Sequence, residues 1–137
     1  MLFEKITLVD TAMQIREGMY LGTEGDRITY LSDTPPEHPA RFGAVYSKSA
    51  GKLFLPGFFN AHSHAPMHLL RGYAENLSLM HWLNDRIFPF EHQLTADDIY
   101  HSCLLNIAEM LRFGIVSTTD MYMAGDALGR AFSDGGV

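Results

Sequence analysis

The stretch LPGFFNAHSHAPMHLLRGY, residues 55–73, is the part of the chain that best indicates its fold. An apolar run leads into His62 and His64, as expected of a strand that is buried on both faces and opens at its C-terminal end. Alternate residues of a strand share a side, so the Cα atoms of the two histidines should lie roughly 6.5 to 7 Å apart. Two imidazoles at that separation can bind one divalent metal ion. The H-x-H pattern alone is weak, however, and two solvated or hydrogen-bonded histidines would explain it more simply.

Composition limits the kinds of protein this chain can be. With 47% hydrophobic and 19% charged residues over 137 positions, the chain has the composition of a globular domain. Its net charge is -6 and no lysine or arginine cluster is present, so we expect no nucleic-acid partner. The apolar runs fall short of the roughly 18 to 20 residues that span a bilayer, and no secretory signal follows Met1. We therefore expect no membrane partner and a cytoplasmic location.

The single cysteine, Cys103, excludes an internal disulfide and a CxxC metal site. Its expected role is that of a small apolar residue on a buried helix face.

The first part of the chain predicts short antiparallel strands. Three β-prone runs, ITLVD (6–10), MYLGT (19–23) and DRITYL (26–31), are separated by turn-forming residues. The segment 32–43 holds three prolines and predicts an exposed loop. The pattern changes near residue 52, where the apolar run described above begins.

The second part of the chain predicts a strand, a long helical connection and another strand. Residues 77–88 have helical periodicity, and Pro89 is predicted to end that helix. Thr95 resembles an N-cap for a helix over about 96–113, with Gly114 at its C-terminal end. The run IVSTTDMYM (115–123) then predicts a second buried strand. This order is typical of a β/α unit in a parallel sheet.

The second part also resembles a known family. Its PGF-x-N-x-H-x-H motif matches the first barrel strand of the amidohydrolase superfamily; the matching residues are Pro56, Gly57, Phe58, Asn60, His62 and His64. The likeness extends through residues 66–91, 94–100 and 104–122. It is strongest toward the cytosine-deaminase-like branch that deaminates S-adenosylhomocysteine and 5′-methylthioadenosine.

The resemblance implies an α/β fold. Residues 53–137 would form the first two β/α units of a metal-dependent (β/α)₈ TIM barrel, and residues 1–52 would contribute strands to a small composite β-sandwich domain. A barrel of this type usually needs about 250 residues, so we expect the chain to be an N-terminal fragment or truncated product of a longer protein. As an isolated monomer it is expected to expose apolar surface, to aggregate and to lack deaminase turnover. A homo-oligomer is also expected from the resemblance.

The resemblance also implies roles for individual residues. His62 and His64 would be the first two ligands of one divalent metal, with Zn²⁺ expected and Fe²⁺, Mn²⁺ or Ni²⁺ left open. Trp82 would cover the nucleoside base, and Glu91 would accept hydrogen bonds from the ribose hydroxyls. Trp82 as core packing and Glu91 as a solvated loop residue are equal alternatives.

Arg71 is a weaker candidate for binding an anionic substrate group. A structural ion pair with Glu75 or Asp85 is the alternative that we expect at least as strongly. Asp120 follows the second predicted strand and is expected to be a hydrogen-bonded structural residue. The histidines without a spaced partner are expected to lie at the surface or to have their hydrogen bonds satisfied; they are His68, His81, His92 and His101.

The reaction that the resemblance implies is hydrolytic deamination. In that family a metal-activated water attacks C6 of the purine, a glutamate transfers protons, an aspartate orients the nucleophile, and ammonia leaves. The third histidine, the fourth histidine, the glutamate and the aspartate of that family lie on later strands, so no catalytic residue is assigned within residues 1–137. Two other functions stay open: an amidohydrolase reaction on another nitrogen heterocycle, and a non-enzymatic module with an incidental metal site.

Overall fold

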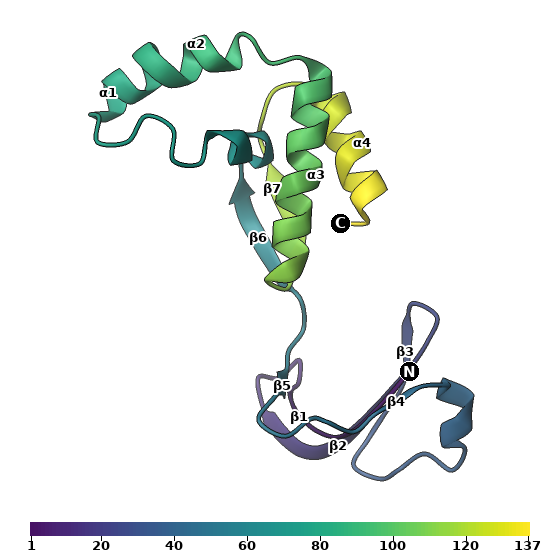
Figure 1. The fold of residues 1–137 in the computed structure, drawn as a ribbon. Coiled ribbons are helices and arrows are strands. Elements are labelled where there is room, and N and C mark those ends of the chain that lie inside the picture. The colour runs from purple at the N-terminus through teal and green to yellow at the C-terminus, as the bar shows by residue number, and fades with distance from the viewer. The chain divides into compact units, whose positions relative to one another are not determined.

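The computed structural model describes residues 1–137, which fold into two compact units, Met1–Pro56 and Gly57–Val137. Each unit has its own secondary structure, shown in Figure 1. The predicted division into a composite β-sandwich domain over residues 1–52 and a barrel domain over residues 53–137 stays a prediction.

The N-terminal unit is a five-stranded sheet. Its strands are β1 (Leu2–Val9), β2 (Ile15–Glu24), β3 (Arg27–Ser32), β4 (Val45–Tyr46) and β5 (Leu53–Phe54). The first three are antiparallel neighbours, as predicted, whereas β4 and β5 both pair with β1 in parallel. Ile6, Leu8 and Met19 form the core of this unit, because alternate side chains of β1 point to one face.

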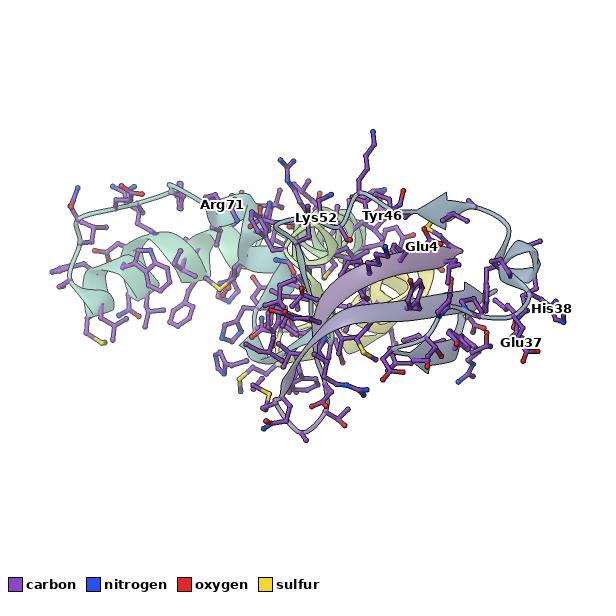
Figure 2. All side chains as sticks on the ribbon, turned by 90° about the horizontal axis from the view of Figure 1, so that it is seen from below. Glu4, Glu37, His38, Tyr46, Lys52 and Arg71 are labelled. Carbon is purple, nitrogen blue, oxygen red and sulfur yellow. The ribbon has the colours of Figure 1, made fainter.

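The segment 32–43 was predicted to be an exposed loop, and this prediction is wrong in part. A 3₁₀ helix, Pro39–Phe42, interrupts it, and Phe42 is buried against β2. A Cβ atom at Gly22 would lie 2.4 Å from the Phe42 ring, so this packing requires a glycine in β2. Farther along, the Lys52 ammonium donates a hydrogen bond to the Tyr46 hydroxyl; Figure 2 labels both residues.

The C-terminal unit is built on two parallel strands, β6 (Phe58–Ser63) and β7 (Ile115–Asp120). Figure 1 shows α3 (Ala96–Arg112) running beside them, so the predicted order of strand, helix and strand is confirmed. Pro56 and Gly57 divide the apolar run into two strands, β5 and β6, which belong to different sheets. The prediction of a strand buried on both faces is wrong for β6, whose Phe58 and Phe59 are 54% and 62% exposed. The prediction of a buried strand over 115–123 is also wrong in part, because β7 ends at Asp120 and has no fully buried residue. Side chains stay exposed on both strands because this two-stranded sheet is not covered on both faces.

The helix α3 begins and ends as predicted. Thr95 and Asp98 form a capping box. The Thr95 hydroxyl accepts a hydrogen bond from the Asp98 backbone amide, and the Asp98 carboxylate accepts one from the Thr95 backbone amide. The hydrogen bonds from Thr95 hold the pKa of Asp98 below its ordinary value. At the other end Gly114 has a φ of +78°, a left-handed conformation that glycine adopts without strain.

The core of this unit lies between α3 and a helix that the sequence analysis did not predict, α4 (Gly125–Gly135). Its buried members are Ala65, Ile99, Cys103, Ile107, Ala127, Leu128 and Ala131. Cys103 is a free, buried thiol, as expected, and burial raises its pKa to about 11. Ser102 donates a buried hydrogen bond to the Pro66 carbonyl, which joins α3 to the 3₁₀ helix Ala65–Leu70 that follows β6.

A continuous helical segment precedes α3 and passes through the predicted stop at Pro89. It consists of α1 (Leu79–Trp82), a π-helical turn η3 (Leu83–Ile87) and α2 (Phe88–Glu91). Phe88 N–H donates to the Leu83 carbonyl, five residues earlier, so the turn before the proline is wide. A wide turn accommodates the missing N–H and the ring of Pro89, which an ordinary α-helical turn would not.

None of the helices has both the length and the apolar character needed to cross a membrane.

Candidate metal and substrate site

The pairing of β6 with β7 brings the candidate residues to one edge of the sheet. The registers Asn60↔Thr118 and Ser63↔Asp120 align the carboxyl ends of the two strands. His62 and His64 therefore lie beside the residues that follow β7. In parallel α/β folds this edge is where ligands usually bind.

The side chains of His62 and His64 converge. Their Nε2 atoms are 3.2 Å apart, and the rings meet edge to face with centroids 4.9 Å apart. A tetrahedral ion with Zn–N bonds of about 2.05 Å separates two nitrogen ligands by about 3.3 Å. The pair therefore fits two positions of one metal ion. No third histidine, cysteine, aspartate or glutamate joins them in a cluster.

A cavity of about 550 Å³ opens beside His64. Two of the three predicted substrate residues also line it, Trp82 from α1 and Glu91 from α2. The rest of its lining is mainly apolar: Met67, Leu83, Ile87, Phe88, Met121, Tyr122 and Met123. Its volume lies in the usual range for small-molecule sites, and apolar walls with few polar groups are typical of them. The structure thus brings His64, Trp82 and Glu91 together around one space.

Glu91 is buried, not a solvated loop residue. Its side chain is in the last turn of α2 with 9% of the residue exposed, and its Oε1 atom accepts a 2.6 Å hydrogen bond from the Tyr122 hydroxyl. Burial and this hydrogen bond raise the pKa of Tyr122 well above its ordinary value, so the hydroxyl remains a donor. Trp82 is half-buried, which leaves part of the indole available to the cavity.

Asp120 has the structural role that the sequence analysis expected. Its Oδ2 atom accepts a hydrogen bond from the Ala65 backbone amide at 2.7 Å, and its Oδ1 atom accepts one from the Tyr122 backbone amide at 3.0 Å. The carboxylate therefore ties the turn after His64 to the segment after β7. This contact contributes to the placement of both His64 and Tyr122.

Arg71 does not line the cavity beside His64. Its guanidinium makes two hydrogen bonds to the Glu109 carboxylate, at 2.8 and 2.7 Å, so the predicted partners Glu75 and Asp85 were wrong. The pair lines a separate hollow that contains none of His64, Trp82 and Glu91. The ion pair raises the pKa of Arg71 and lowers that of Glu109. A substrate role for Arg71 stays a prediction.

Three of the four remaining histidines of the C-terminal unit, His81, His92 and His101, are exposed and make local contacts, as expected, whereas His68 is partly buried and contacts α3. His92 and His101 each direct Nδ1 at the backbone carbonyl four residues earlier, and His81 contacts Asp85. His68 lies 3.8 Å from Glu109.

Tyr122 is the site residue that the sequence analysis missed. It had been treated only as part of the apolar run after Gly114. The signal that could have indicated it is its position two residues after Asp120, at the carboxyl end of the strand predicted to lie beside His62 and His64.

The chain is similar in sequence to known proteins. The amidohydrolase family matches residues 53–136. A 5-methylthioadenosine/S-adenosylhomocysteine deaminase of Symbiobacterium thermophilum is 42% identical over 114 residues, which are 83% of this chain and 26% of that protein. A 5′-deoxyadenosine deaminase of Methanoregula boonei is 44% identical over 88 residues, which are 64% of this chain and 20% of that protein. The chain thus spans about a quarter of the length of these curated relatives or less.

A solved structure is also similar. The adenosine deaminase from Xanthomonas campestris, crystallised with bound zinc, superposes with a TM-score of 0.74 and 28% identity. The match covers 97% of this chain and 31% of that one. The solved neighbours are TIM-barrel amidohydrolases, which confirms the predicted fold class.

The parallel β6–α3–β7 unit, the paired histidines at its carboxyl edge and the match over residues 53–136 agree with one another, and the chain belongs to the amidohydrolase family.

Proposed function

We propose that the protein containing these residues is a metal-dependent deaminase of adenosine-type nucleosides, such as S-adenosylhomocysteine or 5′-methylthioadenosine, and that it releases ammonia. The observation that carries the proposal is the shared cavity of His64, Trp82 and Glu91. A metal ligand, a flat aromatic surface and a carboxylate are what a ribosylated purine would need there. The names of the two curated relatives support the same substrate class.

Four residues of this chain have a part in the proposed reaction: His62, His64, Trp82 and Glu91. His62 and His64 hold one divalent metal, with zinc favoured by the zinc in the solved relative. When bound, such a metal supplies Lewis acidity that makes water a nucleophile at neutral pH. Trp82 covers one face of the purine, and the apolar wall around it excludes water.

Glu91 selects for the sugar in this proposal. A carboxylate accepts hydrogen bonds from two vicinal hydroxyls, and burial strengthens those bonds because water competes less. No cation pairs with Glu91 among the ion pairs of the structure, so its second carboxyl oxygen is available to a substrate donor.

Ammonia release tests this proposal. The protein is expressed from the reading frame that contains residues 1–137 together with any continuation, and is assayed with S-adenosylhomocysteine, 5′-methylthioadenosine, adenosine and several free heterocyclic amines. Turnover of the adenosine derivatives is expected. Activity confined to free bases or triazines would refute the nucleoside assignment and favour a different heterocyclic substrate.

Replacement of Glu91 sharpens the same test. Glu91→Ala should raise KM steeply for ribosylated substrates and hardly at all for a free base, because only the former has the hydroxyls. Glu75→Ala, at an exposed position, is the matched control and should change neither KM.

A further inference from the structure

The side chain of Glu91 has only one hydrogen-bond partner. That partner is the Tyr122 hydroxyl, which donates to Oε1 at 2.6 Å, whereas Oε2 makes no hydrogen bond. This bond fixes which oxygen of the buried carboxylate faces Tyr122 and which is left without a donor. The tyrosine therefore determines where the remaining acceptor sites of Glu91 lie.

Tyr122 is itself held in place from two directions. Its backbone amide donates to Asp120, whose other carboxylate oxygen accepts the amide of Ala65, the residue after His64. Its ring packs edge to face against the His64 ring, with centroids 6.3 Å apart. A path of short contacts thus connects the histidine pair to the carboxylate on α2.

We propose that Tyr122 is a positioning residue that sets the selectivity of this cavity for a sugar with vicinal hydroxyls. By occupying one lone pair of Oε1, it leaves Oε2 and the second lone pair of Oε1 of Glu91 for the two hydroxyls of a ribose. This inference rests on the proposed function, and it adds that Glu91 needs Tyr122 to act.

Removal of the Tyr122 hydroxyl, without loss of the ring, tests this proposal. Tyr122→Phe keeps the ring against His64 and removes only the donor to Glu91. For adenosine and 5′-methylthioadenosine we expect KM to rise about tenfold, as for the loss of one hydrogen bond to a charged group, with kcat little changed. For 2′,3′-dideoxyadenosine, which lacks both hydroxyls, KM should stay the same.

Two further variants separate positioning from general stability. Tyr100→Phe removes a similar bond, from the Tyr100 hydroxyl to Asp134 at 2.8 Å between α3 and α4, and should leave every KM unchanged. In the Glu91→Ala background, Tyr122→Phe should have no additional effect, since residues that act through one another are not additive.

Binding can be measured without turnover. Trp82 is the only tryptophan among residues 1–137 and lines the cavity, so quenching of fluorescence that is lost in a Trp82→Phe variant reports occupancy. The dissociation constant for inosine, a riboside that cannot be deaminated, should rise about tenfold in Tyr122→Phe. That for 2′,3′-dideoxyinosine should not change.

The outcomes are distinct. Equal losses for ribosides and dideoxy compounds, or the same losses in Tyr100→Phe, would overturn the positioning role while leaving the proposed function intact. Unchanged KM and dissociation constants for the ribosides in Tyr122→Phe would also overturn the positioning role. A parent protein that deaminates no nucleoside would overturn the proposed function and this inference with it.

Discussion

Replacement of either histidine of the pair should sharply weaken metal binding. The two Nε2 atoms are already 3.2 Å apart, close to the separation of about 3.3 Å that a tetrahedral zinc ion imposes. Because neither ring has to move far, each should contribute nearly the full energy of one ligand. Four-ligand zinc sites contribute about 10–16 kcal/mol, so one ligand is worth about 3 kcal/mol.

His62→Ala and His64→Ala should therefore each raise the Kd for Zn²⁺ about a hundredfold. The assay is competition with a chromophoric chelator, using the protein from the complete reading frame after its metal has been removed. His101→Ala is the control, because that side chain is exposed and contacts only its own helix. If either variant of the pair binds Zn²⁺ as tightly as the parent, the assignment of that histidine as a ligand is refuted.

Four further predictions concern the framework of the C-terminal unit. Thr95→Ala should lower the free energy of unfolding by about 1 kcal/mol, measured by urea denaturation, because it breaks the capping box of α3. The pKa of Asp98 is lowered in the folded state, so its stabilisation is present above the pKa of the unfolded chain and should disappear as pH falls through the folded pKa; the Asp98→Asn variant should lack this dependence. Gly57→Ala should destabilise the protein by about 1–3 kcal/mol in thermal unfolding, because the new Cβ would lie 2.4 Å from Val116, and Val116→Ala should restore most of the loss. Arg71→Ala should change stability by less than about 1 kcal/mol in urea denaturation, since a half-exposed ion pair contributes little, and a raised KM for adenosine in this variant would support the predicted substrate role of Arg71.

The features that short-range interactions control could be predicted from the sequence. The N-cap of α3 depends on Thr95 and Asp98, three residues apart, and its end depends on the backbone freedom of Gly114. The convergence of His62 and His64 was predicted from strand alternation and is present although β6 ends at Ser63 and its register with β7 is irregular between Asn60 and Ser63. Pro89 shows the limit of such rules, because the wide turn before it lets the helical segment continue to Glu91.

Contacts between distant residues were decided by the tertiary structure alone. The sequence by itself determined the strand–helix–strand order, the two candidate ligands and the likeness to amidohydrolases. Only the fold could show that Tyr122 donates to Glu91, 31 residues away, and that Arg71 pairs with Glu109, 38 residues away. The physical reason is that propensity and periodicity act over a few residues, whereas these pairs depend on how β6, β7 and the helices pack.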